Sequence, residues 1–569
     1  MRNTKTSLIG LLLSVSALAF AAKPASVSDS DNNGAQLAKY LDVYNSIFKQ
    51  LSLYYVDTIN AKKIISSSID EALSSLDPYT SYIPDEESSD FKFMTTGQYG
   101  GIGAVISQHP RSYSIDSTKS EAFDVLISEP YEGLPADKAG LRAGDVIVQI
   151  DKTKIKGQTL SEVSAMLRGI PGTELEVIVN RGSDKKVIKK RLVREKITIP
   201  AVTYYGVVGD STAYILLDQF TEKSAEGVRT AINDLKSKHK ITSIVLDLRN
   251  NPGGLLDQAV EIINLFVPQG KEVLSMRGRA KQLDQVFKTS SAALLPDIPL
   301  AVLVNSSSAS ASEIVSGALQ DLDRAVIIGT RSFGKGLVQS TRELPYNGHL
   351  KLTTAKYYIP SGRCIQAIDY AKRGDDGSST KIPDSLRHEF KTANGRIVKD
   401  GGGIEPDFEV KNDQQLNIVY QLWARNLIFD YATTYCDANK HIAEPETFSI
   451  TDKDFEAFKS FVKSTDFKYE LRTQGRLEWV MDIAKNEGYG ERAAKEFEAL
   501  KKKLTPDIDA DMDLFKKDIV DLINGEIVKR AYYQKGYVRH TLVSDPVLKK
   551  ALEVLNDKEL YTKTLSSKK

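Results

Sequence analysis

The sequence predicts an α/β core that carries an inserted β-rich domain and has helical segments at both ends. Apolar runs such as 244–248 and 298–304 predict buried strands, and helical stretches alternate with them, as α/β architecture requires. From about 97 to 190 the pattern changes to short strands separated by glycine turns. Beyond 411 the chain becomes mainly helical and charged. These three observations define the predicted fold class.

Composition limits the function before any motif is considered. The 569 residues suggest about three or four domains, and 41% hydrophobic with 27% charged residues is ordinary for a chain with a packed core. A formal net charge of +1 without a long basic run argues against nucleic acid as a partner.

The first residues of the chain have the pattern of a secretory signal. Arg2 and Lys5 precede an apolar stretch at 8–19, and Ala19-Phe20-Ala21 is a small-x-small cleavage site. A membrane anchor is the alternative, but the stretch is shorter than the roughly 20 apolar residues that a spanning helix needs. We therefore expect a cleaved signal peptide at 1–21 and a mature protein in the periplasm or outside the cell.

An amino-terminal helical region is predicted over about 35–90. Aromatic and aliphatic side chains recur there at helical spacing, among them Tyr44, Phe48, Leu51 and Tyr55. Such an apolar face packs within a protein or docks on a neighbour.

The carboxy-terminal extension, 411–569, is predicted to be mainly helical. Thr451 with Asp454 three positions later forms a capping box, and Pro546 suits the first turn of a later helix. The extension could pack on the core, form a dimer surface or dock a partner, and the sequence does not choose among these.

Ser310 and Lys335 carry the strongest chemical signal. A serine hydroxyl is a poor nucleophile until a neighbouring base removes its proton. A lysine can act as that base only when it is neutral, and burial in apolar surroundings lowers its pKa. Phe333 and Leu337 flank Lys335, which is compatible with a desolvated amine.

Ser310 is predicted to lie where a buried strand gives way to a helix that begins near Glu313. Amides at the start of a helix are free to donate and suit an oxyanion, and Ala311 supplies one candidate. A second candidate follows the strand at 244–248, where Gly253 and Gly254 let the backbone approach a ligand closely. A plain turn is the alternative interpretation of these two glycines.

No metal or cofactor site is predicted. The six histidines show neither a catalytic context nor a metal-binding spacing. Cys364 and Cys436 are too few and too far apart for a zinc knuckle. In an oxidising compartment they could form a disulfide or remain two thiols.

In these residues and their order, the chain resembles the carboxy-terminal processing proteases, also called tail-specific proteases, which are serine peptidases with a Ser/Lys dyad. The resemblance extends from about Leu41 to Val410. It rests on motifs that follow one another along the chain: Leu76-Asp77-Pro78-Tyr79-Thr80-Ser81, Gly100-Gly101-Ile102-Gly103, Asp247-Leu248-Arg249-Asn250-Asn251-Pro252-Gly253-Gly254, Ser308 to Glu313, Phe333-Gly334-Lys335-Gly336 with Gln339, Tyr357-Tyr358-Ile359-Pro360-Ser361-Gly362-Arg363 and Gly403-Ile404-Glu405-Pro406-Asp407.

The resemblance implies that Ser310 is the nucleophile, Lys335 the general base and Gln339 the residue that positions the lysine. Because positions of equal parity on a strand face one side, we expect Lys335 and Gln339 to point into the same cleft.

Other residues of the implied site are less sharply defined. The family's spacing between nucleophile and lysine selects Ser310 over three neighbouring serines, namely Ser306, Ser308 and Ser312. The implied oxyanion hole combines the amide of Ala311 with that of Gly253 or Gly254.

The resemblance also implies an architecture: an α/β protease core of the crotonase/ClpP-like type with an inserted PDZ domain. The implied segments are the signal peptide 1–21, the amino-terminal helical region 35–90, the PDZ domain 91–190, the Ser/Lys protease core 191–410 and the helical extension 411–569.

A PDZ domain adds a peptide as an extra strand and captures its terminal carboxylate on backbone amides. The expected carboxylate loop consists of Gly101, Ile102 and Gly103. A helix predicted at 160–168 would supply groove residues, although core packing explains them equally well: Val163, Met166 and Leu167. Arg168 resembles an arginine that links PDZ position to the active site in some family members.

The sequence therefore predicts a secreted serine endopeptidase that recognises apolar carboxy-terminal tails through its PDZ domain. Its partners would be proteins or peptides with exposed tails, and the helical ends could form a homodimer or bind an adaptor. One rival is a PDZ scaffold with a silent protease domain, but Ser310, Lys335 and Gln339 are all present. Another rival, an α/β hydratase, would leave the PDZ segment unexplained.

Overall fold

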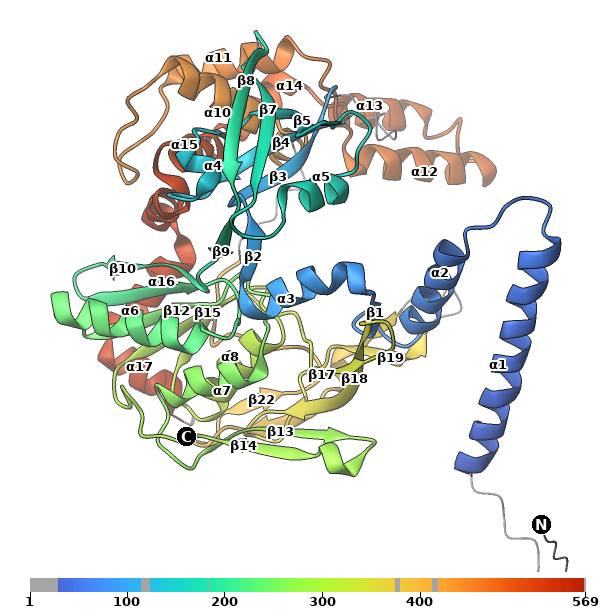
Figure 1. Ribbon diagram of the computed structural model, residues 1–569. Helices are drawn as coiled ribbons and strands as arrows, with labels where there is room; N and C mark the ends of the chain where they lie inside the picture. Colours follow the sequence, from blue (N-terminus) through green and yellow to red (C-terminus); the bar gives the residue numbers. More distant parts are fainter. Residues whose placement is uncertain (1–28, 114–122, 183, 374–378, 412–417, 567–569) are drawn as a thin grey trace, which may run out of the picture. The chain divides into compact units, whose positions relative to one another are not determined.

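A computed structural model describes residues 29–113, 123–182, 184–373, 379–411 and 418–566 (Figure 1). The signal peptide predicted at 1–21 lies outside the described residues. The chain divides into two compact units, one up to Ser75 and one from Leu76 onward.

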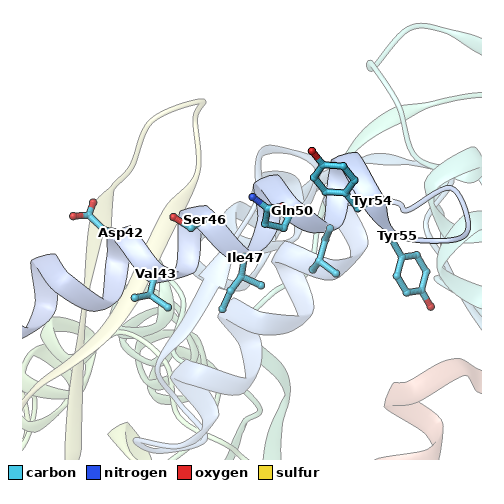
Figure 2. Close-up of a pocket in the computed structure, with 8 residues that line it drawn as sticks. Asp42, Val43, Ser46, Ile47, Gln50, Tyr54 and Tyr55 are labelled. Carbon is cyan, nitrogen blue, oxygen red and sulfur yellow. The ribbon is translucent and has the colours of Figure 1, made fainter.

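The first unit is a pair of helices, α1 (Asp29–Tyr54) and α2 (Ala61–Ser74). They meet through a hydrogen bond between the hydroxyls of Tyr44 and Ser68. Apolar side chains of α1 remain exposed, and Figure 2 shows Val43 and Ile47 along one flank of this helix. The segment with this apolar pattern is therefore a helix, as predicted. Other residues of the first unit leave most of its apolar face exposed.

The second unit, which begins at Leu76, includes α3 (Ser88–Thr96) and the predicted β-rich domain. Its sheet has the strand order β3-β4-β5-β7-β8, with β6 (Thr153–Lys154) on β5. The strands are β3 (Ala104–Pro110), β4 (Phe123–Pro130), β5 (Val146–Ile150), β7 (Glu174–Arg181) and β8 (Lys186–Val193). Two helices, α4 (Pro135–Lys138) and α5 (Leu160–Leu167), accompany the sheet. Strand β3 is an edge strand, so one side of it has no strand partner.

A two-stranded ribbon leads into and out of this domain. It consists of β2 (Gln98–Gly101) and β9 (Glu195–Thr198), which pair antiparallel. The domain is therefore inserted between the start of the second unit and the core sheet.

The core sheet has the order β10-β11-β12-β15-β16-β23. Its strands are β10 (Val202–Val208), β11 (Thr212–Leu217), β12 (Ser243–Asp247), β15 (Leu300–Val304), β16 (Val326–Gly329) and β23 (Phe408–Glu409). All neighbouring strands are parallel except β10 and β11. Every residue of β12 and β15 is buried, which is why β15 is a continuous apolar run and β12 is apolar at its three central residues.

Helices cover both faces of the core sheet. On one face, α6 (Ser224–Lys238), α7 (Leu256–Asn264) and α8 (Ala311–Asp321) share a core with alternate strand residues such as Leu246 and Val302. On the other, Val245 and Leu303 pack with residues of α16 (Pro546–Asn556). The carboxy-terminal extension thus completes the core.

A second sheet joins the core and has β18 (His349–Tyr358) at its centre. Its other strands are β1 (Ser81–Ile83), β13 (Glu272–Gly278), β14 (Gln285–Lys288) and β17 (Leu337–Glu343). The polar segment that follows forms two hairpins, β19 (Ile368–Arg373) with β20 (Ser379–Lys381) and β21 (Glu389–Lys391) with β22 (Ile397–Lys399).

The rest of the extension is helical, as the sequence predicts. Its helices are α9 (Ile418–Ala424), α10 (Leu427–Ala438), α11 (Asp452–Lys463), α12 (Arg472–Asn486), α13 (Ala494–Leu504), α14 (Ile508–Leu514), α15 (Lys516–Ser544) and α17 (Lys558–Leu565). The Thr451 side chain caps α11 together with Asp454, as predicted. None of the helices in the described ranges combines the length and apolarity that crossing a membrane would demand. Cys364 and Cys436 are both free thiols.

Candidate active site

Ser310 lies at the junction between β15 and α8. The helix begins at Ala311, two residues earlier than the sequence suggests, so Ser310 is its cap residue. Its backbone has φ +55° and ψ −112°. A positive φ is uncommon for a residue with a side chain, and such strain is concentrated at functional sites.

The structure distinguishes Ser310 from the three serines considered as rivals, and the adjacent Ser307 is exposed. Ser308 and Ser312 are fully buried, and their hydroxyls donate to Leu248 O at 2.7 Å and Asn251 O at 2.9 Å. Ser306 is exposed on the loop. Only Ser310 is half-buried at the start of the helix.

Of the two glycines after β12, Gly253 lies directly beside Ser310, and Gly254 packs against Phe220. A Cβ on Gly253, whose φ is +101°, would stand 2.8 Å from Ser310 Cβ and 2.9 Å from Ala311 N. The N–H of Gly253 donates to Asn251 Oδ1 at 2.9 Å. Within the described ranges, by contrast, the amides of Ala311 and Gly254 donate no hydrogen bond. The loop therefore offers unengaged donors close to the serine.

Lys335 lies in the loop that precedes β17. Its amine stands over the ring of Tyr79, with 4.1 Å between Nζ and the ring centroid. Burial, followed by the positive charge of Lys351, lowers the pKa of Lys335 to about 8. The predicted apolar cover is only partly correct, because Leu337 is buried whereas Phe333 is exposed.

In the described part of the chain no hydrogen bond joins Gln339 to Lys335, although the parity argument places both in one cleft. The Gln339 amide donates to Thr353 Oγ1 at 3.1 Å. Two features explain the difference: Lys335 precedes the strand, and the register of β17 shifts between Val338 and Gln339. An irregularity of this kind changes which face the following residues occupy.

Glu313 joins the serine loop to the lysine loop, a role that the sequence analysis missed. Its side chain is fully buried. One oxygen accepts the N–H groups of Ser310 at 2.9 Å and Lys335 at 2.8 Å, and the other accepts from Ser332 Oγ at 2.5 Å and Gly334 N at 2.7 Å. Burial raises the pKa of Glu313 to about 7, and these four donors oppose the rise. Glu313 lies three residues after Ser310, at position N3 of the helix. A glutamate at N3 commonly accepts a hydrogen bond from the cap residue, and this spacing could have revealed its role.

Replacing Glu313 by glutamine should lower kcat roughly 10²-fold, because only one of the two acceptor oxygens remains, two of the four donors lose their partner, and small displacements of reacting groups are costly. The amide would present N–H groups to backbone donors, so unfolding should become easier by about 1–3 kcal/mol. The measurements are steady-state kinetics and thermal unfolding. Glu226→Gln, the same change on exposed α6, is the matched control. Equal kinetics for the two variants would show that the junction is dispensable.

The residues predicted for peptide binding come from two places, the expected carboxylate loop at 101–103 and the helix α5. In the described part of the chain, the N–H groups of Ile102 and Gly103 donate no hydrogen bond, and Gly101 ends β2 just before them. Val163 and Leu167 are buried in the core of the β-rich domain, in the same cluster as Ile102.

The remaining residues predicted for the PDZ groove and its coupling to the site lie at the end of α5. Met166 is half-buried and packs at the edge of the domain core. The guanidinium of Arg168 lies 5.4 Å from the ring centroid of Tyr99, a residue of the β2–β9 ribbon. Arg168 therefore contacts the ribbon that leads into the domain.

Comparison with known proteins agrees with this organisation. Residues 211–371 match the model of peptidase family S41, residues 126–181 match a PDZ domain, and residues 418–555 match the C-terminal helical domain of a probable PDZ-protease. A carboxy-terminal-processing protease of Bartonella bacilliformis is 41% identical over 429 residues, which are 73% of this chain and 94% of that protein.

More distant relatives are similar over shorter stretches. A probable CtpA-like serine protease of Staphylococcus aureus is 36% identical over 331 residues, 57% of this chain and 62% of that protein. Among solved structures, a photosystem II D1 C-terminal processing protease is 26% identical with a TM-score of 0.37, and the alignment covers 67% of this chain and 89% of that one.

The α/β core, the inserted domain and the helical extension define a serine peptidase that carries a PDZ domain. The 41% identity extends over nearly the whole length of the Bartonella protein. The chain belongs to peptidase family S41, the carboxy-terminal processing proteases, which confirms the resemblance inferred from its motifs.

Proposed function

We propose that the protein is a secreted endopeptidase that recognises an apolar carboxy-terminal tail and cleaves through an acyl-enzyme on Ser310. The observation that carries this proposal is the junction built on Glu313, which holds the backbones of Ser310 and Lys335 with one carboxylate oxygen. It brings a strained serine and a desolvated lysine to one place in the fold.

The proposed chemistry follows from these positions. Lys335 takes the proton of Ser310 as the hydroxyl attacks the scissile carbonyl, returns it to the leaving amine and then activates water for deacylation. The amides of Ala311 and Gly254 stabilise the oxyanion, while Gly253 must stay glycine to leave room for Ser310. Gln339 positions the lysine indirectly, through Thr353.

Tail recognition is assigned to the PDZ domain. A peptide strand would pair with the edge strand β3, and its carboxylate would meet the unengaged amides of Ile102 and Gly103. Met166, at the end of α5, is the remaining candidate for an apolar contact with the tail. Arg168 would transmit the PDZ position to the site through the ribbon.

The proposal includes the wider organisation of the chain. A signal peptide at 1–21 would direct the enzyme to the periplasm or outside the cell. The boundaries 35–90, 91–190, 191–410 and 411–569 would separate the helical region, the PDZ domain, a crotonase/ClpP-like core and the extension. The uncovered apolar side chains of α1 support pairing with a second copy or an adaptor.

The test compares a model substrate that carries an apolar tail with the same substrate ending in charged residues. We expect kcat/KM to be at least about tenfold higher for the apolar tail, because a groove for apolar groups discriminates by about this factor. Met166→Asp should reduce the preference. Val187→Asp, at an exposed site on β8 of the same domain, should not. Equal kcat/KM of the wild-type enzyme for the two substrates would contradict recognition of an apolar tail.

A further inference from the structure

The contact between Lys335 and Tyr79 points to a role for a residue outside the proposed dyad. The amine stands 4.1 Å from the centroid of the ring. The face of an aromatic ring is negative and attracts an ammonium group, more strongly where water is excluded. Tyr79 and Lys335 are both half-buried, so the contact is shielded from bulk solvent.

Tyr79 is held in place by its own loop and by a neighbouring hairpin. The buried carboxylate of Asp77 accepts the N–H groups of Tyr79 and Thr80, each at 2.8 Å. From β19, Tyr370 packs edge-on against the ring, with centroids 5.9 Å apart and an interplanar angle of 87°, and its hydroxyl donates to the Tyr79 hydroxyl at 3.3 Å. The ring is therefore fixed independently of the lysine.

The same loop is tied to the strands that carry the base motif. Gln339 donates to Thr353 Oγ1, and Thr353 Oγ1 donates to Asp77 Oδ1 at 3.2 Å. Thr353 N also donates to Thr80 Oγ1 at 3.2 Å. These bonds give Gln339 a physical route to the lysine: it supports the loop that presents the Tyr79 ring.

We propose that Tyr79 is a positioning residue that orients the Lys335 amine and stabilises the ammonium formed during the reaction. The inference rests on the proposed role of Lys335 as the base. When Ser310 attacks, its O–H bond breaks and the amine lone pair forms the new N–H bond, so a positive charge develops on Nζ. The ring attracts this charge only weakly compared with a carboxylate. A carboxylate in the same position would keep the lysine protonated before the reaction begins.

Other charges act on the same amine. Lys351 on β18 disfavours the ammonium, whereas Asp77 and Glu313 favour it. The Tyr79 hydroxyl faces Tyr370, and burial raises its pKa, so the phenol stays neutral while the lysine titrates. The ring is thus the neighbour whose contribution can be removed without changing the net charge of the site.

The experiment is the pH dependence of kcat/KM for the full-length wild-type enzyme, Tyr79→Phe and Tyr79→Leu. Tyr79→Leu should shift the acidic limb to lower pH by about half a unit to one unit, because the ammonium loses a cation–π contact, and should lower the plateau. Tyr79→Phe keeps the ring face and should retain the wild-type apparent pKa. Tyr358→Leu, which removes a ring that lies over Arg277 on the same sheet, should leave the apparent pKa unchanged.

Two results would overturn the inference: an unshifted profile for Tyr79→Leu, or an equal shift for Tyr79→Phe, which would assign the effect to the hydroxyl. If thermal unfolding shows that Tyr79→Leu is not folded, Tyr79→Met supplies the same test with an unbranched side chain. Lys335→Ala separates this inference from the proposed function. An active Lys335→Ala enzyme would refute the base assignment, whereas an inactive one with an unshifted Tyr79→Leu profile would refute only the role of Tyr79.

Discussion

Replacing Ser310 by alanine should lower kcat/KM about 10⁴-fold or more while the protein stays folded, as expected when a nucleophile that acts as a unit with its base is removed. The side chain is half-buried and does not support the core, so the unfolding temperature should change little. Cleavage of a tailed substrate and a thermal unfolding curve measure the two quantities.

The neighbouring serines provide the controls. Ser306→Ala changes an exposed side chain of the same loop and should have no effect on either quantity. Ser308→Ala and Ser312→Ala each remove a buried hydrogen bond and should cost about 1 kcal/mol of stability while activity persists. If Ser310→Ala cleaves as fast as the wild-type enzyme, another residue is the nucleophile.

Replacing Lys335 by methionine should be nearly as severe as the loss of Ser310, because the side chain keeps its length but can no longer accept a proton. Under the proposed mechanism only the neutral amine is active, and the pKa of Lys335 is about 8. Below that pH the protonated form dominates, so kcat/KM should fall about tenfold for each unit of pH and reach its plateau above pH 8.

Lys335→Arg is the matched control, because a guanidinium retains the positive charge and cannot act as a base at any accessible pH. It should be inactive over the whole range in which the wild-type enzyme works. An acidic optimum for the wild-type enzyme would contradict a neutral lysine base.

The sequence predicted the fold well where local patterns decide it. The buried parallel strand β15 is a continuous apolar run, β12 has an apolar centre, and the cap at Thr451 is a local signal, so these predictions were correct. Ser310 could likewise be placed at a strand-to-helix junction. These features depend on neighbouring residues along the chain.

Features that depend on distant contacts were missed or misplaced. The shift of register at Gln339 cannot be recognised from residue parity. Val163 and Leu167 have the same apolar character whether they line a groove or fill a core, and only packing shows the second. The loops of Tyr79 and Lys335 are far apart in the sequence, so their contact required the fold.

The cover that α16 provides for the core sheet has a consequence for how the enzyme comes into existence. The strands lie in the middle of the chain, but the helix that buries their second face is made near its end. Arg249, beside the glycine loop, also pairs with Asp545 at the start of that helix, at 2.6 Å. During synthesis from the amino terminus, the peptidase core therefore keeps an open apolar face until its own carboxy-terminal segment arrives. The protease thus completes its core only when its helical extension has been made.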